Sequence, residues 1–76
     1  MTKKAIEKLD EKSRERIELW RYHNIEAIRR GDEHDRARYS GKIRGYLECL
    51  QDLGKITELE KKALYLYYAA HAPLNE

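Results

Sequence analysis

The chain of 76 residues contains only two segments that can convincingly end a helix before its last few residues. They are Gly31-Asp32 and Gly54-Lys55-Ile56-Thr57. Glycine ends a helix readily because it adopts the left-handed conformation, and Asp or Thr can cap the helix that follows. Further on, Pro73 forbids the continuation of a helix. These breaks divide the chain into three helical segments, without a repeat or a linker.

The second break ends in a capping box, Thr57-Glu58-Leu59-Glu60, which predicts the start of the last helix. In this motif the Thr hydroxyl and the Glu carboxylate each accept a hydrogen bond from a backbone amide at the helix start. We therefore expect a helix over residues 58–71. One of its apolar faces holds Leu59, Ala63, Leu66, Tyr67 and Ala70, and another holds Leu64, Tyr65 and Tyr68. Such a helix should lie deep in the fold or against a partner.

The segment before Gly31 predicts one amphipathic helix over residues 3–30. Its candidate buried residues recur at spacings of mostly three and four, and two of them are small and polar. They are Ile6, Leu9, Ser13, Ile17, Trp20, Asn24, Ala27 and Ile28. The start of this helix stays open, because Thr2 and Asp10 are both suitable N-caps.

Asp32 can cap a second helix, expected over residues 33–53 and ended by Gly54 in the left-handed conformation. Its apolar stripe consists of Ala37, Ser40, Gly41, Ile43, Leu47, Leu50 and Leu53. Each glycine inside a helix costs about 1 kcal/mol relative to alanine. Gly41 and Gly45 therefore suggest a place where a neighbouring helix approaches closely.

Composition supports a helical fold. Phe and Val are absent, and the apolar residues are mainly Leu, Ile, Ala and Tyr among Glu, Lys and Arg, which favour helix at exposed positions. An apolar content of 41% is enough for a compact core. Short connections favour an antiparallel arrangement of consecutive helices. We predict an all-α, small three-helix domain spanning residues 1–76, in which a helical hairpin carries a third helix packed across it.

No motif in the chain carries recognisable chemistry. His23, His34, His71 and Cys49 lack the spacing of a metal site, so we expect neither metal nor cofactor. Cys49 lies beside the apolar stripe of the second helix and should be a buried, inert thiol, while His34 and His71 should be surface residues. Phosphate-binding loops and nucleophile motifs are also absent, which argues against an enzyme and a small-molecule substrate.

The sequence favours a cytoplasmic protein. A single cysteine cannot form an intramolecular disulfide, and no segment resembles a secretory signal. The longest apolar run, residues 63–70, is far shorter than the roughly 20 residues that span a bilayer, so we expect no membrane segment.

Two kinds of surface could bind a macromolecule. Tyrosines suit interfaces because ring and hydroxyl fit a half-wet site, so Tyr65, Tyr68 and Leu64 are candidates for contact with a protein partner or a second copy. The alternative is a nucleic-acid surface, since six basic and three acidic residues give the segment 29–45 a charge of +3. Its candidate residues are Arg29, Arg30, Arg36, Arg38, Lys42 and Arg44. Ordinary solubilising charge explains the same residues, because helical spacing spreads them around the helix.

The second half of the chain resembles a group of small uncharacterised helical proteins carried on mobile elements, including conjugative transposons, of Gram-positive bacteria. The likeness runs from Gly45-Tyr46-Leu47 through the capping box to Tyr67-Tyr68. It implies a bacterial cytoplasmic accessory protein and brings no activity. The stretch from Ile56 to Tyr68 also looks like the first helix of the promoter-reading region of sigma factors. Such regions continue into a recognition helix, which we do not expect in the few residues after Pro73.

Overall fold

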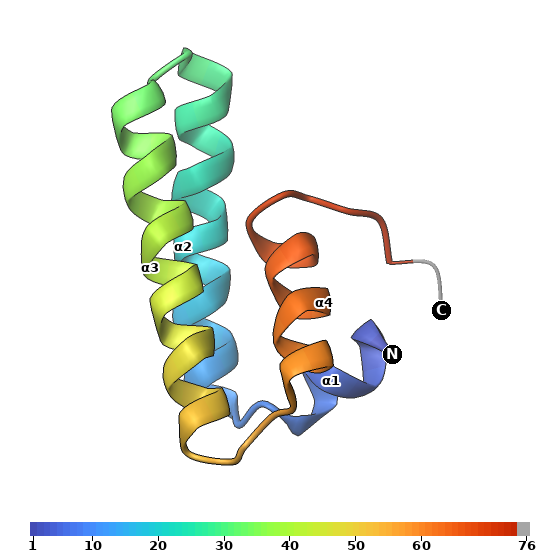
Figure 1. Ribbon diagram of the computed structural model, residues 1–76. Helices are drawn as coiled ribbons and strands as arrows, with labels where there is room; N and C mark the ends of the chain where they lie inside the picture. The colour runs from blue at the N-terminus through green and yellow to red at the C-terminus, as the bar shows by residue number, and fades with distance from the viewer. Residues whose placement is uncertain (75–76) are drawn as a thin grey trace.

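The computed structural model describes residues 1–74, and these residues form four α-helices. They are α1 (Thr2–Lys8), α2 (Glu11–Arg30), α3 (Glu33–Asp52) and α4 (Glu58–Tyr68). α2 and α3 form a long hairpin, α4 lies beside its lower half, and α1 lies near the start of α4 (Figure 1). The all-α prediction is confirmed, whereas the predicted number of three helices is wrong. Asn75 and Glu76, at the end of the predicted domain, lie outside the described residues.

The first predicted helix is divided at Leu9 and Asp10, where the backbone becomes extended. The Asp10 carboxylate accepts a hydrogen bond of 2.7 Å from the amide of Ser13 and so caps α2. The Arg14 side chain donates to the carbonyl of Leu9 across the corner. Of the two candidate caps, Asp10 is the one that begins the long helix. The break lets α1 turn back toward α4, where the Lys8 ammonium lies 2.8 Å from the Glu60 carboxylate.

The two predicted breaks are both found. Gly31 has φ 70° and Gly54 has φ 74°, so each adopts the left-handed conformation that favours glycine. Asp32 caps α3 through a 3.0 Å bond from the amide of Asp35. At the start of α4, the Thr57 hydroxyl accepts from the amide of Glu60, and the Glu60 carboxylate accepts from the amide of Thr57. The capping box is therefore complete, as predicted.

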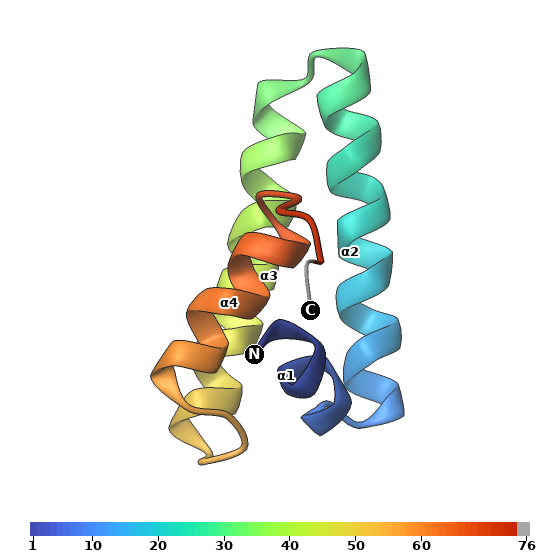
Figure 2. The ribbon, with the colours of Figure 1, turned by 90° about the vertical axis from the view of Figure 1, so that its right-hand side faces the viewer.

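α4 ends three residues earlier than predicted, and Pro73 is not the cause. The backbone leaves the helix after Tyr68, and His71 adopts φ 57°, in the left-handed region. The amide of Ala72 then donates to the carbonyl of Leu66, which closes the turn. After this turn the C-terminal segment runs away from the hairpin, toward the side on which α1 lies (Figure 1). The upper half of the hairpin extends beyond α1 and α4 (Figure 2).

The core draws side chains from all four helices and from the connection before α4. Its members are Ala5, Leu9, Ile17, Ile43, Leu47, Ile56, Leu64, Tyr68 and Ala69. Burying a large apolar side chain of this kind stabilises the fold by roughly 1.5–3 kcal/mol relative to an exposed one. Because α1 and α4 meet only the lower part of the hairpin, Ile28 near its tip is 46% exposed, against the prediction.

The two small polar residues predicted within the buried stripe of α2 are indeed buried, and each is hydrogen-bonded. The Ser13 hydroxyl lies 2.9 Å from the Tyr46 hydroxyl, and Asn24 bonds to α3 near the middle of the hairpin. The glycines of α3 behave differently from the expectation. A Cβ added to Gly41 or Gly45 would meet no atom within 4 Å, so no helix approaches closely there.

Candidate functional site

The tyrosine-rich helix presents a different surface from the one predicted. Leu64 is completely buried and Tyr68 is 1% exposed, so neither side chain is open to a partner while the fold is intact. Burial, followed by the charge of Glu18, raises the pKa of the Tyr68 hydroxyl to about 12. Of the three candidate interface residues only Tyr65 is half-buried and accessible. The other two belong to the core because they lie on the side of α4 that packs against α1, α2 and α3.

The exposed apolar residues of α4 lie on the opposite side of the helix. Leu59 is 61% exposed and Leu66 is 53% exposed, although both were expected on a packing face. Their separation of seven residues places them on one stripe of α4. Sequence periodicity could not choose between the two apolar faces of this helix, because both repeat at helical spacing.

A groove of about 480 Å³ runs between α3 and α4. Its lining residues are Arg44, Leu47, Glu48, Lys61, Lys62, Tyr65 and Leu66. Apolar atoms make up most of the exposed lining, and basic side chains stand at both edges. Arg44 pairs with Glu48 at 3.4 Å, whereas Lys61 and Lys62 have no carboxylate within ion-pair distance in the part of the chain that the structure describes. The groove is therefore an apolar channel with a surplus of positive charge, and we call it the α3–α4 groove.

The predicted nucleic-acid residues are dispersed over the hairpin, and most of them are paired with carboxylates. The pairs are Arg29 with Glu26, Arg30 with Asp35, Arg36 with Glu33, Arg38 with Asp35, and Arg44 with Glu48. Such exposed pairs contribute little to stability, but they reduce the positive charge that phosphates would meet. Within residues 1–74, Lys42 alone among the six has no ion-pair partner.

A small polar cluster joins the middle of the hairpin to the C-terminal turn. The guanidinium of Arg21 lies 4.5 Å from the ring centroid of Tyr67 and donates to its hydroxyl. His71 Nε2 lies 2.7 Å from Asn24 Oδ1, so this histidine is half-buried rather than a free surface residue. Burial, followed by the charge of Arg21, lowers the pKa of His71. This cluster holds the C-terminal segment in place.

The remaining candidates for chemistry stand apart from one another. Cys49 is exposed, so the expectation of a buried thiol is wrong: it lies on the side of α3 away from the core. Among the described residues, no group of three or more His, Cys, Asp and Glu side chains could hold a metal ion. None of the helices within residues 1–74 combines the length and the apolar character that crossing a membrane requires.

Comparisons with known proteins identify no relative of this chain. No protein-family model matches the chain, and neither the curated proteins nor the solved structures contain a significant match.

Proposed function

We propose that this protein is a non-enzymatic interaction module that binds an amphipathic helix of another protein in the α3–α4 groove. The apolar face of that helix would contact Tyr65 and Leu66, and its acidic residues would face Lys61 and Lys62. Helices are commonly recognised in this way, through an apolar groove with charged edges. The preferred partner is acidic because the edges of the groove carry more positive than negative charge.

The observation that carries the proposal is the combination of an open apolar channel with lysines that have no described ion-pair partner. Leu59 extends the apolar surface of Leu66 along α4 beyond the groove, and both leucines are more than half exposed. Water-exposed leucines next to a groove favour burial against a partner. The sequence resemblance to small accessory proteins of bacterial mobile elements fits such a role, and we place the protein in the cytoplasm on the same basis.

The test uses a synthetic amphipathic helical peptide of roughly 18 residues, long enough to form a helix, with leucines on one face and glutamates on the other. Backbone amide shifts of the protein are followed by NMR during the titration. We expect shifts concentrated at Lys61, Lys62, Tyr65 and Leu66. A second peptide with the same leucines and with lysines in place of the glutamates should bind at least several-fold more weakly.

Two matched substitutions separate the groove from general charge effects. Lys62→Glu should weaken binding of the acidic peptide, whereas Lys4→Glu, at an exposed position of α1, should not. Similarly, Tyr65→Ala should weaken binding and Tyr22→Ala, on a tyrosine 59% exposed on α2, should leave it unchanged. Shifts scattered over the molecule, or equal binding of the two peptides, would refute the proposal.

A further inference from the structure

We propose that a second surface, on the side of the α2–α3 hairpin away from α4, binds single-stranded nucleic acid. Its rings are Trp20, His23, Tyr39 and Tyr46, and its cations are Arg16, Arg38 and Lys42. We call this set the aromatic face. It shares only Arg38 and Lys42 with the nucleic-acid residues predicted from the sequence, and it shares none with the α3–α4 groove.

The rings of the aromatic face contact one another across the hairpin. Trp20 of α2 packs edge-to-face on Tyr46 of α3, with 5.7 Å between the ring centroids. Further up the hairpin, His23 stacks on Tyr39 at 4.9 Å. All four side chains are half-buried, so each ring is fixed by its neighbours and still presents part of its surface to solvent. Two helices thus build a strip of two aromatic pairs, and the Lys42 ammonium lies between a ring of each pair.

The cations lie on these rings. The Lys42 ammonium is 5.5 Å from the ring centroid of Tyr39 and 6.0 Å from that of Trp20. The guanidinium of Arg16 is 5.9 Å from the ring centroid of Tyr46. Cation–π contacts of this kind hold a charged side chain in place without neutralising it. These exposed cations therefore lie beside the rings in the free protein, before any ligand arrives.

Carboxylates compete little for these cations. Arg16 and Lys42 have no acidic partner within ion-pair distance among residues 1–74, and Arg38 lies 3.9 Å from Asp35, close to the limit of an ion pair. The same Asp35 carboxylate lies nearer to Arg30, at 3.3 Å. Arg44, on the α3–α4 side of the hairpin, differs in this respect because it is paired with Glu48.

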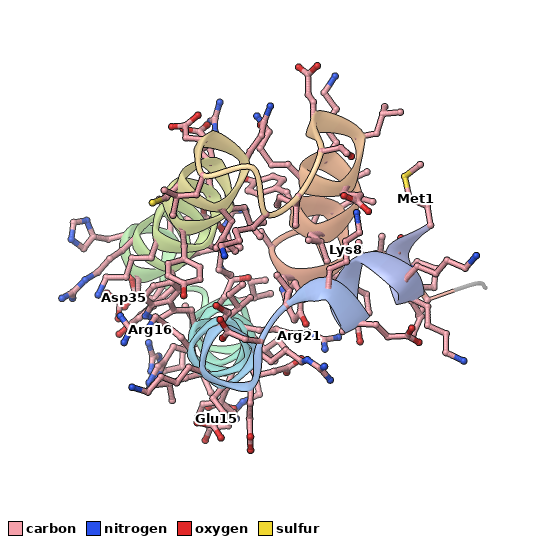
Figure 3. The ribbon with its side chains drawn as sticks, turned by 90° about the horizontal axis from the view of Figure 1, so that it is seen from below. Met1, Lys8, Glu15, Arg16, Arg21 and Asp35 are labelled. Carbon is pink, nitrogen blue, oxygen red and sulfur yellow. The ribbon has the colours of Figure 1, made fainter. Side chains whose placement is uncertain are left out.

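The two surfaces lie on different sides of the molecule. Seen from below, Arg16 extends from α2 on the side away from α1 and α4, whereas Arg21 extends toward them (Figure 3). On α3, Lys42 and Arg44 are two residues apart, which places them about 200° apart around the helix. A ligand on the aromatic face would therefore leave the groove free.

Rings and neighbouring cations together favour a single strand over a duplex. Phosphates would bind Arg16, Arg38 and Lys42, and unpaired bases could stack on the exposed parts of Trp20 and Tyr39. In a duplex the bases are already stacked on one another and paired, so they are not available to stack on the rings of the protein. A protein partner would use the rings without needing the cations, and the salt dependence distinguishes these cases.

Trp20 is the only tryptophan of the chain, so its fluorescence reports directly on this face. The probe is an oligothymidylate of about 12 nucleotides, within the usual span of a single-strand site. We expect quenching at 50 mM salt. Affinity should fall about twentyfold at 200 mM salt if three phosphates are contacted, and about sevenfold if two are. A duplex of the same length should bind more weakly and quench less.

Substitutions assign the effect to the aromatic face. Lys42→Ala should weaken binding and reduce the salt slope by about 0.7, the contribution of one phosphate contact on a single strand. Its matched control is Arg44→Ala, on the same helix but paired with Glu48, which should bind like the parent protein. Tyr39→Leu keeps an apolar side chain and removes the ring, so it should weaken binding with an unchanged salt slope. Circular dichroism checks that each variant is folded.

Three results would overturn the proposal that the aromatic face binds single-stranded nucleic acid. The absence of quenching at 50 mM salt would overturn the proposal, and so would quenching that salt does not reduce. Equal weakening by Lys42→Ala and Arg44→Ala would also overturn it, because general charge would then explain the binding. None of these results depends on whether the α3–α4 groove binds a peptide.

Discussion

His71 Nε2 and Asn24 Oδ1 lie 2.7 Å apart and join the C-terminal turn to the middle of the hairpin. Asn24 Nδ2 donates to the carbonyl of Arg36 and to the hydroxyl of Ser40, at 3.0 and 3.1 Å. Asn24 Oδ1 is therefore the acceptor, and His71 carries its proton on Nε2. In the part of the chain that the structure describes, the buried His71 Nδ1 has no hydrogen-bond partner. Protonation would place a second N–H donor on this buried nitrogen with no acceptor, so the surroundings of His71 favour the neutral imidazole.

Mild acid should weaken the fold through His71. The pKa of an unperturbed histidine is about 6.5, and burial followed by the charge of Arg21 lowers the pKa of His71 below this value in the folded state. Above pH 6.5 the group is neutral in both states, and the free energy of unfolding is at its full value. Below pH 6.5 the unfolded chain binds the proton first, so stability falls until the folded-state pKa is passed.

Urea denaturation at pH 7 and pH 5 measures this effect. His71→Gln removes the titrating group and should give a smaller difference between the two pH values than the parent protein. Carboxylates whose pKa is lowered, such as Glu26 beside Arg29, lose their contribution at more acidic pH and do not interfere. If the free energy of unfolding differs between pH 7 and pH 5 by the same amount in both proteins, His71 does not control stability in this pH range.

Replacing Asn24 should destabilise the protein more than replacing an exposed polar residue does. Asn24→Ala removes three hydrogen bonds and leaves half-buried groups on Ser40 and His71 without their partner. We expect a loss of about 1–3 kcal/mol in the free energy of unfolding, measured with urea. Glu15→Ala, at an exposed position of the same helix, is the control and should change stability by no more than about 0.5 kcal/mol.

Two glycines of α3 should be replaceable with a gain in stability. Because an added Cβ at Gly41 or Gly45 meets no atom within 4 Å, alanine should stabilise the helix at each position by up to about 1 kcal/mol. Gly31→Ala is the contrasting variant, since φ 70° strains any residue with a side chain, and it should destabilise the protein. Thermal unfolding should therefore move in opposite directions, and loss of stability in Gly41→Ala would reveal a contact that the structure lacks.

The two sides of α4 should respond differently to truncation. Tyr68 is 1% exposed, so Tyr68→Ala should cost about 3–5 kcal/mol and can unfold a protein of this size. Leu66→Ala, at a side chain 53% exposed, should cost little. Far-ultraviolet circular dichroism with urea titration compares the two. Similar losses would mean that the outer stripe of α4 is packed in solution.

The candidate site was only partly predictable. The sequence identified Tyr65 as an accessible tyrosine and Lys42 as a cation of the hairpin. The pairing of Arg36 and Arg44 with carboxylates three and four residues away could also have been predicted from helical spacing. The aromatic face was missed because its rings come from two helices, and their proximity depends on how the hairpin is aligned. A search for aromatic residues at matching distances from the Gly31 turn, such as His23 and Tyr39, could have found it.

The sequence by itself determined the local structure. Gly31, Gly54 and the Thr57 capping box act through neighbouring backbone groups, so helix starts and stops follow from a few adjacent residues. Tertiary structure decided which of the two candidate caps, Thr2 or Asp10, begins the long helix. It also decided the early end of α4 at Tyr68 and the choice of which apolar face of α4 is buried. Each of these depends on contacts between residues distant in the chain, such as Lys8 with Glu60 and Asn24 with His71. The spacing of apolar residues along the chain carries no information about the energies of such contacts.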